Sequence, residues 1–221
     1  MHINNPKFKL LPFILAFFFL CIGYAQQISI NDTFSAQELI EDHLIDGCVE
    51  ISNVQSVVNG RVNSINSFGY FERSNSSFPF ENGILLSTGS AISAGNTLNA
   101  NPLSEGEVDW TTDTDLEDAL GITNTLNATS IEFDFISVSN QVQFNYILAS
   151  EEYYANYPCE YSDGFAFLIK EAGTSDPYVN VALIPGTNVA VNTSNIHEEV
   201  VGFCPADNEQ YFDGYNLGDT N

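Results

Sequence analysis

One acidic and aromatic segment, residues 150–163, carries the side chains best suited to bind a ligand. Carbohydrate sites combine aromatic side chains with carboxylate and amide groups, and Ca²⁺ often organises them. The segment therefore predicts a ligand-binding surface, whose candidate residues are Glu151, Glu152, Tyr153, Tyr157, Tyr161 and Asp163. Its three candidate Ca²⁺ ligands are Glu151, Glu152 and Asp163. Alternatively, the tyrosines cover a sheet edge while the acids cap turns or stay solvated.

Paired carboxylates also serve as acid and as nucleophile or base in glycoside hydrolases. Glu151 and Glu152 are neighbours, however, and neighbouring side chains on a strand point to opposite faces. A hydrolase would need its second carboxylate from elsewhere, such as Asp163. His43 and His197 lack a nucleophile motif such as G-x-S-x-G, and we expect His197 at the surface. The chain is therefore predicted not to be an enzyme, with glycoside hydrolysis as the third possibility after two kinds of binding.

A second acidic segment, residues 109–118, has five carboxylates within ten residues. Asp113 and Asp115 are candidate Ca²⁺ ligands because they alternate with other residues. The segment lacks the central glycine and the terminal glutamate of an EF-hand loop, so that motif is excluded. A solvated loop or the first turn of a helix explains the same residues without a metal.

The ligand-binding segment is expected to lie between two strands. Apolar residues alternate along 142–148 and along 165–169, which is the period of a strand. Residues 131–135 alternate in the same way and are predicted to pair with 142–148 through a turn at 137–141. Residues 179–183 and 189–191 flank Pro-Gly-Thr-Asn, which predicts a further hairpin.

The remaining patterns indicate one helix followed by strands. Ser35 and Glu38 form a predicted capping box for a short N-terminal helix, and Asn59-Gly60 is a hairpin-turn signal. Short strands punctuated by Gly, Asn and Ser predict an all-β fold, an antiparallel β-sandwich or jelly-roll-like domain. The segment from Phe203 onward has no evident closing strand, so the domain at 26–221 is expected to be truncated at its C-terminal end.

Residues 1–25 are predicted to be a secretory signal peptide. Lys7 and Lys9 precede an apolar run, and Gly23-Tyr24-Ala25 is a small-x-small cleavage site. No segment after Ala25 is apolar enough over sufficient length to span a membrane. The mature chain is therefore expected to be secreted or held at the bacterial cell surface, without a transmembrane segment.

Export determines how the cysteines are interpreted, because disulfides persist in oxidising compartments. Cys48, Cys159 and Cys204 lie after the leader and allow three pairings. We favour Cys159–Cys204, since both lie in polar, loop-like sequence. Cys48 lies in an apolar run and is expected to pack as a small buried hydrophobe.

The charge of the chain excludes one class of partner. There are 29 Asp and Glu residues against 5 Lys and Arg, for a formal net charge of -24. Outside the leader the basic residues are Arg61, Arg73 and Lys170. Nucleic acid binding is excluded because it needs a basic patch. The surplus of carboxylates suits a solvated extracellular surface and the binding of hard cations such as Ca²⁺.

Four sequence blocks occur in the order ENGILLSTGSAISAGN, IEFDFISVSNQVQFNYILASEEY, SDGFAFLI and VALIPGTNVAVNTSN. Together they resemble the choice-of-anchor L domain of secreted and surface proteins, chiefly from Bacteroidetes, over about residues 48–212. The resemblance implies an extracellular β-rich module, and we expect a non-catalytic interaction or adhesion role with an extracellular glycan or protein partner. Residues 163–167, DGFAF, are also similar to a strand entry in legume-type lectins, which favours calcium-dependent glycan binding as the alternative.

Overall fold

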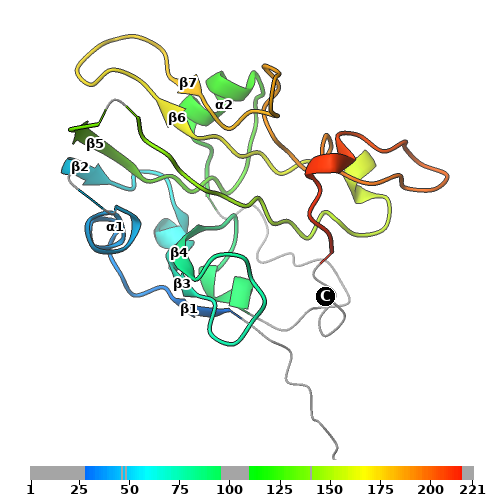
Figure 1. Ribbon diagram of the computed structural model, residues 1–221, viewed down its shortest axis with the longest axis horizontal. Helices are drawn as coiled ribbons and strands as arrows, with labels where there is room; N and C mark the ends of the chain where they lie inside the picture. The colour runs from blue at the N-terminus through cyan, green and yellow to red at the C-terminus, as the bar shows by residue number, and fades with distance from the viewer. Residues whose placement is uncertain (1–27, 46, 48, 96–109, 140, 216–221) are drawn as a thin grey trace, which may run out of the picture.

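The computed structural model describes residues 28–45, 47, 49–95, 110–139 and 141–215, and within them the strands pair in antiparallel sheets with few short helices. Strand order is β1-β3-β4 in the first sheet, β2-β5 in the second and β6-β7 in the third (Figure 1). The strands are β1 (Ser29–Asn31), β2 (Val49–Gln55), β3 (Phe68–Glu72), β4 (Asn82–Leu86), β5 (Glu132–Ser137), β6 (Leu168–Ile169) and β7 (Val179–Asn180). The predicted all-β class is confirmed at this level.

The helical segments are short. They are α1 (Ala36–Glu38), η1 (Leu39–Leu44), η2 (Gly60–Asn63), η3 (Ala91–Gly95), α2 (Thr114–Leu120), η4 (Tyr157–Cys159) and η5 (Glu209–Tyr211). The predicted capping box is confirmed, because Ser35 Oγ accepts from the Glu38 amide at 3.2 Å and Glu38 Oε2 accepts from the Ser35 amide at 2.7 Å. These two bonds satisfy donors that a helix start otherwise leaves unpaired.

The first sheet is covered by the N-terminal helical turn. Leu39 and Ile40 of η1 are 0% exposed, and Phe68 of β3 is 1% exposed. Gly69 lies so close to β1 that an added Cβ would be 2.7 Å from the Asn31 carbonyl oxygen, so no larger residue fits there. Burial of these apolar side chains is the main source of stability in this part of the chain.

The second sheet corrects two pairings predicted from sequence. β5 pairs with β2, with Ile51 opposite Phe135, rather than with residues 142–148. The Asn59-Gly60 hairpin is also wrong, because Asn59 caps the helical turn η2 by accepting from the Arg61 amide at 2.9 Å. Asn-Gly favours several compact turns, and the sequence signal alone does not select a hairpin.

Residues 141–150 form no regular strand, contrary to prediction, but they lie along the following apolar segment. Ring centroids are 4.4 Å apart between Phe144 and Phe167 and 5.0 Å apart between Tyr146 and Phe165. As one residue number rises the other falls, so the two segments run antiparallel. Aromatic contacts therefore join the two segments that were predicted to be strands.

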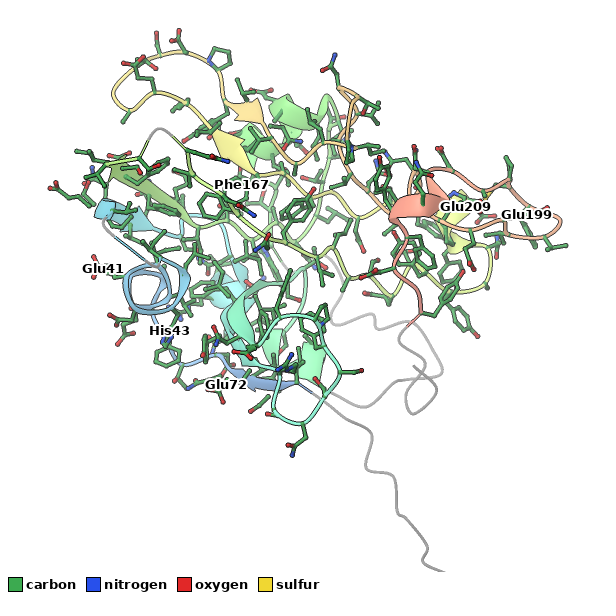
Figure 2. All side chains as sticks on the ribbon, in the orientation of Figure 1. Glu41, His43, Glu72, Phe167, Glu199 and Glu209 are labelled. Atoms are coloured by element: carbon green, nitrogen blue, oxygen red, sulfur yellow. A yellow bond between two sulfur atoms is a disulfide. The ribbon has the colours of Figure 1, made fainter. Side chains whose placement is uncertain are left out.

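The predicted hairpin at 179–191 is confirmed by an antiparallel bridge between Leu183 and Ala190 and by a 2.8 Å bond from the Ile184 amide to the Val189 carbonyl. Its apolar residues form a second core. Ala182, Ile184 and Val191 are buried there, with Phe165, Phe167 and Ile196 packed against them. Figure 2 labels Phe167 among the crowded side chains below β6 and β7.

Cys48 and residues 96–109 lie outside the described residues, so the expected packing of Cys48 stays a prediction. The search for membrane-spanning helices, which covered the described residues, found none of sufficient length and hydropathy.

Candidate functional site

The segment 150–163 forms a loop whose two ends meet. The Ser150 hydroxyl donates a short hydrogen bond to Asp163 Oδ2, and Ser150 Oγ accepts from the Glu152 amide at 3.0 Å. Beyond Asp163, Gly164 makes an antiparallel bridge to Asn192. Ser150 thus closes the base of the loop, a role that sequence analysis did not assign to it.

A disulfide fastens the middle of this loop to a hairpin that runs from Ile196 to Asp207. Cys159 and Cys204 are joined with Cα atoms 5.9 Å apart, which confirms the predicted pairing. The Tyr153 hydroxyl adds a second tie by donating to the Ile196 carbonyl at 2.8 Å. Figure 1 shows the loop at η4 beside the orange and red C-terminal segment, although more than forty residues separate them in sequence.

Two residues with hydroxyl groups, Thr193 and Ser194, hold the C-terminal end of the loop. Sequence analysis did not identify either of them. Thr193 is 0% exposed, and its Oγ1 accepts from the Asp163 amide at 3.3 Å. The Ser194 hydroxyl donates to the Tyr161 carbonyl at 2.8 Å. Both belong to a polar Asn-Thr-Ser-Asn run that directly follows an apolar strand pattern, and that position was the available signal.

Three tyrosines of the loop form a ladder of edge-to-face rings, which we call the tyrosine ladder: Tyr154, Tyr157 and Tyr161. Ring centroids are 5.9 Å apart in the first pair and 5.3 Å apart in the second, within the range of favourable aromatic pairs. Tyr154 is 48% exposed and Tyr161 is 52% exposed. The ladder is therefore a pre-arranged aromatic surface that meets solvent.

Tyr153 faces the other way. Its ring lies against Phe212 with centroids 5.0 Å apart. Burial, and to a smaller degree the charges of Tyr215 and Asp163, raises the pKa of Tyr153 to about 12. This predicted binding residue therefore anchors the loop to the C-terminal segment.

The loop carboxylates differ in their surroundings. Glu151 is exposed, whereas Glu152 is half-buried and its Oε2 atom is enclosed without a hydrogen-bond partner. Burial, followed by the negative charges of Asp163 and Glu151, raises the pKa of Glu152. A second enclosed oxygen without a partner is Oδ1 of Asn192. Asn192 bridges to Gly164 and the charge of Asp163 acts on Glu152, so both residues lie near the base of the loop.

The structure does not bring the second acidic segment to this site. Asp113 is the N-cap of α2, where its carboxylate accepts from the amides of Asp115 at 3.0 Å and Leu116 at 3.1 Å. Figure 1 shows α2 beside β6 and β7, away from η4. α2 also shows that a second helix exists besides the one expected. Within the described ranges, no group of three or more His, Cys, Asp or Glu side chains is arranged to hold a metal ion.

The predicted surface position of His197 is wrong. The side chain is 3% exposed and lies beside the disulfide. Its backbone pairs with Asp207 through bonds of 2.9 and 3.1 Å, and this pairing turns the ring inward even though Glu198 and Glu199 follow it in sequence. The other conspicuous histidine, His43, packs between the rings of Phe34 and Tyr70.

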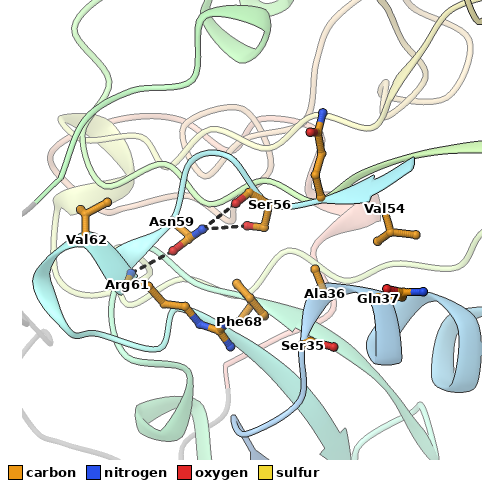
Figure 3. A pocket seen from close by; sticks show the side chains of 10 residues that line it. Ser35, Ala36, Gln37, Val54, Ser56, Asn59, Arg61, Val62 and Phe68 are labelled. Carbon is orange, nitrogen blue, oxygen red and sulfur yellow. Dashed lines mark hydrogen bonds between the residues drawn. The ribbon is translucent and has the colours of Figure 1, made fainter. Parts of the chain in front are cut away.

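A groove near the N-terminal helix was not anticipated from sequence (Figure 3). Its volume is about 580 Å³, and its lining includes Gln37, Asn59, Arg61, Val62 and Phe68. The polar groups there already have partners: Asn59 Nδ2 donates to the Ser56 carbonyl at 3.0 Å, and Arg61 lies 4.5 Å above the Phe68 ring. These contacts give the groove a structural explanation.

Comparison with protein families matches the choice-of-anchor L domain over residues 27–221. The chain belongs to the choice-of-anchor L domain family. The match includes all four sequence blocks and confirms the resemblance that they carry. Searches of curated proteins and of solved structures gave no match. The family describes a surface-anchored type of protein module and is not a known enzyme family.

Proposed function

We propose that this choice-of-anchor L domain is a secreted, non-catalytic interaction module of a bacterial surface protein, adhesive or scaffolding in role. The observation that carries the proposal is the tyrosine ladder, an exposed aromatic surface on a loop fastened by a disulfide and by hydrogen bonds at its base. Preorganised aromatic side chains lose little conformational entropy on binding and dominate many recognition surfaces. The proposed partner is an extracellular glycan or protein.

The surroundings of the carboxylates support a non-catalytic role. Asp163 accepts the Ser150 hydroxyl, and Glu152 keeps one oxygen enclosed. A glycoside hydrolase instead needs an acid and a second carboxylate that face each other across the bond to be cleaved. The loop therefore fits recognition better than hydrolysis.

Two further parts of the proposal concern the secretion of the chain and the way its sheets pack together. We infer that residues 1–25 are removed as a signal peptide and that the small antiparallel sheets stack as a sandwich. N-terminal sequencing of the secreted chain tests the first inference, with Gln26 expected as the first residue. A crystal structure of the secreted chain tests the second, with the sheets expected to pack face to face.

Binding to arrays of extracellular glycans and matrix proteins tests the main proposal. The triple variant Tyr154→Ala, Tyr157→Ala, Tyr161→Ala is expected to lose at least about tenfold in affinity for whatever the native chain binds, since aromatic anchors each contribute more than about 1 kcal/mol. The matched control is Tyr211→Ala, which removes another exposed tyrosine outside the ladder. Equal binding by the triple variant, or turnover of a polysaccharide that is lost in Glu152→Gln, would contradict the proposal.

A second candidate is calcium-dependent glycan binding, and the enclosed oxygens favour it. Glu152 Oε2 and Asn192 Oδ1 are both enclosed without hydrogen-bond partners. Both residues lie near the loop base, since Asn192 bridges to Gly164 and the charge of Asp163 acts on Glu152. Carboxylate and amide oxygens are the ligands that Ca²⁺ takes in proteins. A cation there would explain both enclosed oxygens and would neutralise the charges that raise the pKa of Glu152.

Thermal melts with Ca²⁺ and with EDTA test this candidate. If Ca²⁺ binds only the folded chain, the midpoint rises with its concentration. The rise is expected to vanish in Asn192→Leu and to persist in Asp115→Asn, which alters the separate acidic segment. Identical midpoints in Ca²⁺ and EDTA would remove the metal, whereas chelator-sensitive binding on a glycan array would make this the main function.

A further inference from the structure

A buried histidine lies against the disulfide of the ligand-binding loop. His197 is 3% exposed, and its Nε2 is 4.0 Å from Cys204 Sγ. The opposite ring nitrogen, Nδ1, is 2.7 Å from the Glu198 carbonyl oxygen. Backbone pairing with Asp207 holds the residue in this position.

These contacts determine the tautomer of the ring. A carbonyl oxygen only accepts hydrogen bonds, so Nδ1 carries the hydrogen and, in the neutral ring, Nε2 presents its lone pair. That lone pair points at a disulfide sulfur, which has no proton to donate. If the disulfide opened, Cys204 would supply a thiol whose proton Nε2 can accept, and a neighbouring imidazolium lowers the pKa of a thiol.

We propose that Cys159–Cys204 is a thiol–disulfide exchange site in which His197 stabilises Cys204 as the leaving thiolate. In exchange, a thiolate attacks one sulfur, and the sulfur with the lower thiol pKa leaves faster. The asymmetry created by His197 therefore directs attack to Cys159. The product is a mixed disulfide between Cys159 and the incoming thiol.

The step balances without an oxidant or a reductant. The incoming thiol loses its proton and its sulfur forms a bond to Cys159 Sγ. The Cys159–Cys204 bond breaks and its electron pair stays on Cys204 Sγ. The proton of the incoming thiol passes to solvent, and one proton from solvent is taken up by the pair of Cys204 Sγ and His197 Nε2, so one disulfide and one thiol are present before and after the step.

Charge around the site selects the class of thiol. The exposed acids are Glu160 beside Cys159, Glu198 and Glu199 beside His197, and Asp207 opposite His197. Figure 2 shows Glu199 near the outer end of this hairpin. No Lys or Arg occurs in 150–163 or in 196–215. The site therefore favours a thiol on a cationic or neutral molecule, such as a cysteine flanked by basic residues, over an anionic thiol.

The exchange changes the loop that carries the tyrosine ladder. η4, which contains Tyr157, ends at Cys159, and the disulfide is its covalent tie to the hairpin. Attack on Cys159 would free the middle of the loop from that tie while leaving it attached to the incoming partner. The same site could thus convert a reversible contact at the ladder into a covalent one.

Mass spectrometry of the native chain tests the proposal. Free thiols are first blocked with iodoacetamide, and the folded chain is then incubated with cysteamine, a cationic thiol, or with glutathione, an anionic one. The expected result is an adduct on Cys159 in about tenfold excess over Cys204. The ratio of the cysteamine rate to the glutathione rate is measured for the folded and for the denatured chain. At low salt this ratio is expected to be about threefold higher in the folded chain, and high salt should remove the difference.

In the variant His197→Gln, the amounts of adduct on Cys159 and on Cys204 are expected to be equal. The control His43→Gln is expected to keep the excess on Cys159. If His197→Gln does not fold, the site preference of the native chain decides the matter alone. Equal labelling of both cysteines in the native chain, an excess on Cys204, or no adduct unless the chain is denatured would each overturn the proposal. So would a preference that survives in folded His197→Gln.

Discussion

The two halves of the described chain, residues 28–139 and 141–215, differ in the interactions that stabilise each of them. Residues 28–139 contain β1 to β5, and β3 alone makes five register pairs with β4. Residues 141–215 contain only the two-residue strands β6 and β7, with isolated bridges elsewhere. Longer backbone ladders and the buried side chains of Leu39, Ile40 and Phe68 stabilise the first half. The second half has short bridges and a small core of its own, and adds side-chain hydrogen bonds, aromatic contacts and a disulfide.

The comparison explains where the candidate site lies. A loop held by specific side-chain bonds can present residues in shapes that a ladder of strands does not allow. The tyrosine ladder, the enclosed Oε2 atom of Glu152 and the histidine at the disulfide all occur in the second half. The first half contains the longer strand ladders.

The largest expected effect is in the first half. Phe68→Ala removes a side chain that is 1% exposed and should lower the free energy of unfolding by about 4 kcal/mol, because it loses buried area and leaves a cavity. Urea unfolding measures the change. Val179→Ala, at a residue 59% exposed in the second half, should change it by less than about 0.5 kcal/mol. Equal losses from both would break the comparison.

Removal of the disulfide tests the second half. Cys159→Ala with Cys204→Ala should cost about 3 kcal/mol, since the bond closes a loop across 45 residues. Hydrogen exchange should rise in 150–163 and 196–212 and stay unchanged in β3 and β4. Increased exchange throughout the chain would show that the two halves unfold as one unit.

The cap of α2 should contribute less. Asp113→Ala leaves two amides of the first turn without their acceptor and is expected to cost about 1 kcal/mol. Asp118→Ala, at an exposed position of the same helix, is the control. Thermal unfolding in Ca²⁺ and in EDTA should give the same difference, because Asp113 acts here as a cap. A difference that depends on Ca²⁺ would return Asp113 to the list of metal ligands.

Tyr153 should make the stability of the folded chain depend on pH in the alkaline range. Its pKa is raised from 10.0 to about 12, so the folded chain keeps the phenol proton where the unfolded chain loses it. The contribution of Tyr153 to the free energy of unfolding should be constant below pH 10 and fall as the pH rises towards 12. Tyr153→Phe should lose about 1 kcal/mol at pH 7, with the bond to Ile196, and part of the alkaline decline. Urea unfolding at pH 7, 9 and 11 measures both, and an unchanged alkaline slope would contradict the assignment.

Glu152 should have the smallest effect and the opposite sign. Because its pKa is raised, the ionised form is disfavoured in the folded chain, and the penalty appears as the pH rises through the folded pKa. In EDTA, Glu152→Gln is expected to stabilise by about 0.5 kcal/mol at pH 7, after solvent screening, and by nothing near pH 4. Glu151→Gln, at the exposed neighbour, is the control. If Glu152→Gln destabilises at pH 7 with Ca²⁺ present, the calcium candidate gains support.

Local patterns determined much of this protein. The capping box at Ser35, the hairpin around Pro185-Gly186 and the likeness to the choice-of-anchor L domain follow from neighbouring residues, because caps and turns depend on bonds within a few positions. The choice of Cys159–Cys204 came from the loop character of both segments. The calcium and glycan predictions stay predictions, since they concern molecules outside the chain.

Tertiary structure alone decided which distant segments meet. The partner of β5 is β2, about eighty residues earlier, and an alternating pattern cannot say which strand lies beside it. The burial of His197 likewise follows from its pairing with Asp207, although the acidic residues beside it favour the surface. Sequence therefore located the loop between 150 and 163, while the fold decided which of its tyrosines face solvent, because exposure depends on packing against the hairpin at 196–207.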